Sequence, residues 1–196
     1  IPVVARETDR RGRSIPFRCG RDFIFYALAF HEKPVRHPKD LESPLMGTKV
    51  PSWLIFTMFH VKNVPQLLLQ NGLQLMINGK AVSSWAQLVL RLAIPGRVSW
   101  ETVKRDVQQA IAANKAIGID ISLGWCGLLD HVLFVYGEDD DNYYVLDSHS
   151  ITGLPYERVH NKLFLMKLPK LEVKKRLKLF SRVWKVVPRG TKTEPS

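Results

Sequence analysis

The sequence lacks the features on which several classes of protein depend. Two cysteines are too few for a disulfide framework, and neither belongs to a CxxC pair. No apolar run approaches the roughly 20 residues that cross a bilayer, and no charged-then-apolar signal segment opens the chain. A GxxxxGK phosphate loop and a GxSxG elbow are both missing. We therefore expect a soluble domain without a transmembrane segment, whose compartment the sequence leaves open.

Residues that could bind metals do not have the spacing of metal sites. The aspartate run at 139–141 begins like a calcium loop, but an EF-hand needs glycine at its sixth position and glutamate at its twelfth. Those positions hold Tyr144 and Ser150. Cys126 and His131 lack a third ligand at zinc spacing. The sequence thus predicts no metal and no cofactor, and we interpret the aspartate run as a solvated turn.

The chain does have an ordinary globular composition and an excess of positive charge. Its 196 residues are 45% hydrophobic, which suits one domain with a proper core. The net charge is +11, and basic residues are dense at 6–21 and 167–189. Such an excess favours acidic partners, but no RNP-like, zinc-finger or helix-turn-helix signature indicates nucleic-acid binding. We interpret the two dense sets as solvated basic ends.

The apolar pattern predicts helices in the first half of the chain and antiparallel strands in the second. Helical spacing occurs over 20–32, 63–70, 84–92 and 99–114, and strands are expected over 73–77, 115–122, 162–168 and 178–187. The window 53–59 fits either a strand or a buried helical turn. This order indicates an α+β fold rather than a βαβ alternation. We divide the chain into an arm at 1–14, a single domain at 15–187 and a disordered tail at 188–196.

The functional hypothesis begins with residues 130–147. They form two runs rich in β-branched and aromatic residues, joined by an acidic turn. If the two strands pair about a centre at Asp139, His131 directly faces Asp147. Opposed Cβ atoms lie roughly 5 Å apart, so the carboxylate can reach the imidazole. A histidine held by a carboxylate is two-thirds of a nucleophilic triad.

Cys19 supplies the third member of such a triad. It stands at the start of a predicted helix, where the backbone N–H groups and the helix dipole stabilise a thiolate and offer donors to an oxyanion. Cys126 is the rival nucleophile, but it lies in a loop only five residues before His131 and no helix follows it. His149 and His160 are alternative bases, and neither has an aligned carboxylate.

Three segments occur in a meaningful order: Cys19-Gly20-Arg21-Asp22-Phe23 at a helix start, the helix at 99–114 followed by a strand at 116–119, and the hairpin from Asp130 to Ser148. In this order the chain resembles papain-like cysteine peptidases, most closely the C39-like branch. The resemblance implies a papain-like fold with N-terminal helices packed on an antiparallel sheet, and a peptide or protein substrate. It implies Cys19 as the nucleophile, His131 as the general base and Asp147 as the residue that orients the imidazole.

One position departs from the pattern of that family. The family places a glutamine about six residues before the cysteine as a donor to the oxyanion, whereas this chain has Arg13 there and no glutamine before Gln66. Arg13 and the backbone of Cys19 are the candidate oxyanion donors that remain. Loss of one such donor can cost about 10² to 10³ in rate. The alternative is a catalytically degenerate papain-like scaffold that serves as a binding module for an acidic protein or a nucleic acid.

Overall fold

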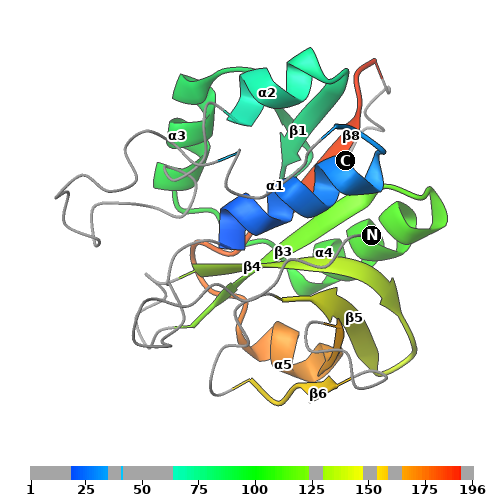
Figure 1. Ribbon diagram of the computed structural model, residues 1–196. Coiled ribbons are helices and arrows are strands. Elements are labelled where there is room, and N and C mark those ends of the chain that lie inside the picture. Colours follow the sequence, from blue (N-terminus) through cyan, green and yellow to red (C-terminus); the bar gives the residue numbers. More distant parts are fainter. Residues whose placement is uncertain are drawn as a thin grey trace, which may run out of the picture.

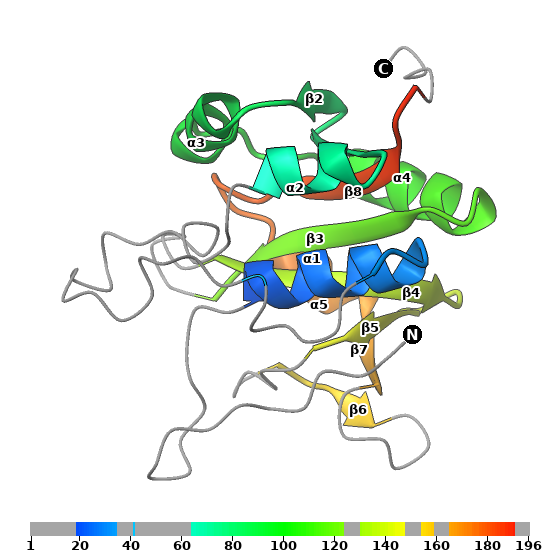
Figure 2. The same cartoon turned by 45° about the horizontal axis from the view of Figure 1, so that its top comes forward.

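An antiparallel sheet with helices on both faces makes up the fold (Figures 1 and 2). The computed structural model describes residues 19–34, 41, 64–123, 130–147, 154–158 and 165–190. Within these ranges the eight strands are ordered β2-β1-β8-β3-β4-β5-β7-β6, and every neighbouring pair is antiparallel. The α+β class expected from the sequence is confirmed. No helix in these ranges is long and apolar enough to cross a membrane.

The described elements have the following bounds. The helices are α1 (Cys19–Phe30), α2 (Val64–Gln70), α3 (Trp85–Ala93), α4 (Trp100–Ala112) and α5 (Lys170–Lys175). The strands are β1 (Leu73–Ile77), β2 (Lys80–Val82), β3 (Ala116–Ser122), β4 (Asp130–Glu138), β5 (Asn142–Leu146), β6 (Glu157–Arg158), β7 (Leu165–Pro169) and β8 (Val183–Pro188).

The two faces of the sheet bury separate apolar clusters. Helices α1, α2 and α3 contribute to the first cluster, where Phe23 packs against Phe134 and Trp184. Helices α4 and α5 contribute to the second, together with Ile117 and Ile119 of β3. Alternation along the strands therefore directs successive side chains into different cores. Helix α1 lies across β3 and β4 on the first face, as both views show.

The helix boundaries follow the capping residues in the sequence. The Ser84 hydroxyl accepts a hydrogen bond from the Gln87 N–H at the start of α3, and Ser99 accepts one from Thr102 at the start of α4. Gly72 follows α2 with a φ of 71°, a conformation that glycine adopts without strain. These three predicted boundaries are confirmed.

The sequence prediction missed several elements in the second half of the chain. Helix α5 and strand β6 were not expected, and β8 begins at Val183 rather than at Lys178. The residues before β8 instead form a turn, in which the Ser181 N–H donates to the Lys178 carbonyl. Strand β8 also lies between β1 and β3. Strand β1 was predicted at 73–77, whereas β2 was not, and both belong to the same sheet as the strands of the second half.

The predicted register of the β4–β5 hairpin is also wrong. Phe134 pairs with Leu146, and the register shifts between Val135 and Gly137, as at a β-bulge. The turn is fixed by Asp139, whose Oδ1 accepts hydrogen bonds from the N–H groups of Asp141 and Asn142 at 2.9 and 2.7 Å. This turn chemistry moves the centre of the hairpin beyond Asp139, and His131 does not directly face Asp147 across the two strands.

The interpretation of the basic segments as solvated ends fails at two arginines. Arg21 and Arg182 expose only 1% and 3% of their surface. Other basic side chains of the second segment contact carboxylates: Lys170 Nζ lies 2.7 Å from Glu138 Oε2, and Lys185 Nζ lies 3.2 Å from Asp106 Oδ2. Part of the basic excess therefore neutralises acidic groups of the fold itself.

Gly118 allows α1 to approach β3 closely, and this generates a stability prediction. A Cβ at Gly118 would lie 2.6 Å from Phe23 Cε2 and 3.1 Å from Val132 Cγ1, and Phe23 is fully buried. We expect Gly118→Ala to lower the free energy of unfolding by about 1–3 kcal/mol, the range for overpacked cores. Urea unfolding of the variant and the wild type measures this difference in free energy. Gly96→Ala is the control because nothing lies within 4 Å of its Cβ position, and equal stability of the two variants would contradict the packing argument.

Candidate active site

The predicted site residues meet at the end of the sheet where β4 begins and β5 ends. Cys19 is the first residue of α1, His131 the second residue of β4, and Asp147 follows β5 directly. The distance from His131 Nε2 to Asp147 Oδ2 is 3.1 Å, and His131 also makes a side-chain hydrogen bond with Cys19. All three residues are at least 95% buried.

The contact between His131 and Asp147 is a diagonal one. One step beyond the Phe134–Leu146 pair, Asp147 comes level with Leu133, which is two residues from His131. Side chains two residues apart project from the same face of a strand, so diagonal neighbours remain within reach of each other. The predicted proximity of the two residues is confirmed, although the predicted direct opposition is not.

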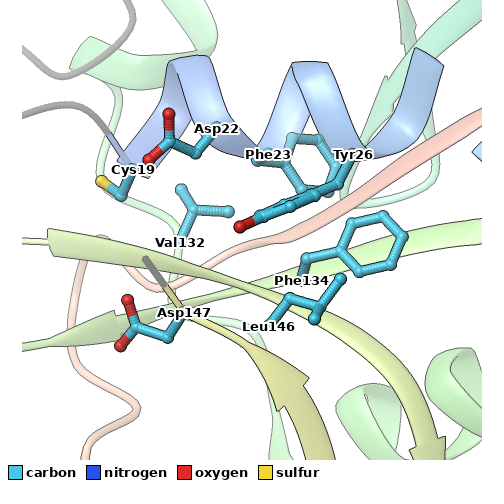
Figure 3. A pocket seen from close by; sticks show the side chains of 8 residues that line it. All are labelled: Cys19, Asp22, Phe23, Tyr26, Val132, Phe134, Leu146 and Asp147. Atoms are coloured by element: carbon cyan, nitrogen blue, oxygen red, sulfur yellow. The ribbon is translucent and has the colours of Figure 1, made fainter. Parts of the chain in front are cut away.

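A small pocket opens between the first turn of α1 and strands β4 and β5 (Figure 3). Cys19 and Asp22 line it from the helix, and Asp147 lies across from them. The remaining lining side chains are mostly apolar: Phe23, Tyr26, Val132, Phe134 and Leu146. The nucleophile candidate therefore stands at the edge of a pocket with a carboxylate on each side.

The charge on His131 depends on its two neighbours. Burial alone would lower the pKa of His131, because it disfavours the charged imidazolium. The negative charge and hydrogen bond of Asp147, followed by those of Cys19, outweigh burial and raise the pKa to about 10. His131 is therefore protonated at neutral pH. An imidazolium beside a cysteine stabilises the thiolate, which is the nucleophilic form.

Tyr156 is a site residue that sequence reasoning missed. Its hydroxyl donates a hydrogen bond to Asp147 Oδ2, the same oxygen that faces His131. Burial and the negative charge of Asp147 raise the pKa of Tyr156, so the phenol stays protonated and remains a donor. No periodic pattern or motif marks this position, and only the tertiary structure places it beside Asp147.

Asp22 was predicted in the first turn of α1, but its place in the pocket was not. Its Oδ1 lies 2.8 Å from Arg21 Nε and 2.7 Å from Arg21 Nη2, and both side chains are buried. Asp22 therefore lines the pocket as the acidic partner of a buried ion pair with its neighbour Arg21.

A second group of charges lies beside His131, and two of its members, Arg182 and Asp120, are buried. Arg182 Nη1 is 3.8 Å from Asp120 Oδ2 and 3.7 Å from Asp130 Oδ2, and Trp184 Nε1 donates to Asp120 Oδ2 at 2.6 Å. Burial is the largest influence on both carboxyls, raising the pKa of Asp120 to about 7 and that of Asp130 to about 6. The sequence did not indicate this group, because its members come from three strands and the residue before one of them.

Several sequence candidates lie outside the described residues. These are Arg13, Cys126, His149 and His160, and the window 53–59. Among the described residues, no cluster of His, Cys, Asp and Glu could hold a metal ion. Asp139, the first residue of the suspected calcium loop, accepts hydrogen bonds from Asn142 and Tyr144 instead. Of the two oxyanion candidates, the described residues include only the Cys19 backbone, at the start of α1.

The raised pKa of His131 generates a prediction about stability and pH. Because folding raises this pKa from 6.5 to about 10, the stabilisation is complete below pH 6.5 and is lost as the pH rises toward 10. We expect Asp147→Asn to lower the free energy of unfolding by about 3 kcal/mol at pH 6.5, as for a broken buried pair. Urea unfolding should show that the difference in free energy of unfolding between Asp147→Asn and wild type becomes steadily smaller as the pH rises to 9.5.

Asp106→Asn is the matched control for this measurement. Asp106 is also buried, but it contacts Lys185 rather than a histidine. The difference in free energy of unfolding between Asp106→Asn and wild type should therefore change little between pH 6.5 and 8.5. If the Asp147→Asn difference stays constant over the same range, the pair does not hold a proton on His131 in the native state.

Comparison with known proteins identifies no related protein for this chain. No protein-family model matches the chain, and a search of curated proteins gives no significant match. The chemistry of the site is therefore argued from the side chains that the fold brings together.

Proposed function

We propose that the chain is a papain-like cysteine hydrolase of the C39-like type, acting as a peptidase. The observation that carries the proposal is the contact of His131 with both Asp147, at 3.1 Å, and Cys19 at the start of α1. A base oriented by a carboxylate and placed against a thiol is the arrangement that activates a cysteine nucleophile. The α+β architecture, with α1 packed on the sheet, is compatible with the proposed fold.

The reaction would proceed through a thioester. The Cys19 thiolate attacks the carbonyl carbon of a peptide, and the resulting tetrahedral oxyanion collapses as the C–N bond breaks. His131 gives its proton to the departing amine. Neutral His131 then takes a proton from water, whose oxygen attacks the thioester, and the Cys19 thiolate leaves as the carboxylic acid product forms. Asp147 keeps the imidazole in place through both steps.

The start of α1 is suited to the oxyanion. The first N–H groups of a helix have no intrahelical acceptor, so they can donate to a charge that develops next to them. Cys19 is the first residue of α1, so in this proposal its own N–H would lie next to the reacting carbon. In this proposal the Cys19 backbone is one oxyanion donor, and Arg13 would be the second.

One observation favours a second candidate, a degenerate papain-like scaffold that binds an acidic protein or nucleic acid. Cys19 exposes only 5% of its surface, and the pocket beside it is small. A nucleophile must be reached by its substrate, whereas a structural cysteine need not be. The excess of positive charge, +11 in total, would then serve the partner. Accessibility of the Cys19 sulfur in the native protein separates the two candidates.

Alkylation with iodoacetamide at pH 6.5 tests the proposal. We expect native Cys19 to react faster than Cys126, with the labelled residue identified by mass spectrometry. His131→Ala should slow Cys19 by on the order of tenfold to a hundredfold, because an unassisted thiol is mostly protonated at this pH. Cleavage of a peptide library should be lost in Cys19→Ala.

His31→Ala provides the control histidine. Its Nε2 lies 2.9 Å from the Val186 carbonyl oxygen, so it contacts the backbone and belongs to no proposed catalytic group. Cys19 should react at the wild-type rate in this variant. Equally slow reaction of Cys19 and Cys126, unchanged by His131→Ala, would exclude the peptidase and leave the binding scaffold.

A further inference from the structure

The carboxylate of Asp147 has two neighbours on a single oxygen. Oδ2 lies 3.1 Å from His131 Nε2 and accepts the hydrogen bond of the Tyr156 hydroxyl. A carboxyl group attached through two rotatable bonds is not held by one contact alone. A second donor on the same oxygen restricts the rotation of the carboxylate and therefore the direction in which it faces the imidazole.

Tyr156 is itself held in place by the surrounding structure. Its ring packs against the apolar cluster on the α4 side of the sheet, and its N–H donates to the carbonyl of buried Leu154 at 2.9 Å. Strand β6 follows immediately, and Glu157 pairs with Lys167 of β7. Strand β7 in turn pairs with β5, which ends one residue before Asp147. Tyr156 thus reaches Asp147 from a supported segment.

We propose that Tyr156 is a positioning residue of this site, whose hydroxyl fixes the Asp147 carboxylate toward His131 and so maintains the imidazolium beside Cys19. This inference rests on the proposed function. Tyr156 touches neither the nucleophile nor the reacting carbonyl in this scheme, and it acts only through Asp147. We therefore expect Tyr156 to affect the reactivity of Cys19 at a pH at which ionisation of the thiol depends on His131, and not at a pH at which a thiol ionises by itself.

The pH dependence of Cys19 alkylation distinguishes this role from a structural one. At pH 6 a cysteine thiol is ionised only with assistance, whereas at pH 9.5 an ordinary thiol ionises by itself. We expect Tyr156→Phe to slow iodoacetamide labelling of Cys19 about tenfold at pH 6, the scale of one hydrogen bond to a charged group. At pH 9.5 its rate should equal that of the wild type. General damage to the fold would change both rates.

Tyr143→Phe is the matched control. Tyr143 is fully buried in the same apolar cluster as the Tyr156 ring, but its hydroxyl makes no hydrogen bond to any described residue. This variant removes a buried phenol oxygen without touching Asp147. Its labelling rates should match the wild type at both pH values.

A double-mutant cycle shows whether Tyr156 acts through Asp147. In an Asp147→Asn background, Tyr156→Phe should add less than a twofold further loss at pH 6, because the oriented charge is already gone. Additive losses would overturn the inference. A partly unfolded Tyr156→Phe protein would behave differently, because exposure of Cys19 would change its labelling rate at pH 9.5 as well as at pH 6, and in both backgrounds.

The outcomes separate the two levels of the proposal. If wild-type Cys19 is no more reactive at pH 6 than an ordinary thiol, the proposed function itself fails. If wild-type Cys19 is reactive and Tyr156→Phe behaves like Tyr143→Phe, the peptidase proposal stands and the positioning role of Tyr156 is excluded.

Discussion

The buried contact between His131 and Asp147 is the interaction on which the rest of the site depends. Both side chains are almost completely buried. Burying either charged group without a partner would cost free energy, because the charge loses its hydration. The two charges can be buried as a pair, because the protonated imidazole and the ionised carboxylate compensate each other. The sheet makes this possible by joining the first residues of β4 to the last residues of β5. The helix start at Cys19 then needs only to lie beside a cation that the sheet already holds.

The hairpin shows what could be predicted from the sequence and what could not. Alternating β-branched and aromatic residues identified both strands, and polar residues at their ends identified the pair. The register was beyond reach, because it depends on the Asp139 side chain capturing the N–H groups of the turn and on an irregularity after Val135. The shifted register nevertheless leaves the two residues of the pair close together. A diagonal contact and a direct one both keep His131 within reach of Asp147.

Helix α1 was predicted from its apolar spacing, and it begins where the cysteine was expected to mark its start. The depth at which it lies was not predictable. That depth comes from Gly118, where the missing side chain lets the Phe23 ring rest on β3. Likewise Tyr156 carries no local signal, because its partner is fixed by strand pairing from β5 through β7 to β6. Local pattern identifies the members of a site that lie on regular elements and misses those brought in by pairing across the sheet.

Charge is the property for which the linear sequence was most misleading. The basic segment at 167–189 looks like a solvated surface, yet Arg182 is buried and joins two halves of the molecule. Its Nη2 donates to the Leu92 carbonyl at the end of α3, while Nη1 faces Asp120 of β3 and Asp130 of β4. Asp130 directly precedes His131. The arginine therefore ties the helical layer to the strand that carries the proposed base, and its positive charge lowers the pKa of both carboxyls against the opposing effect of burial.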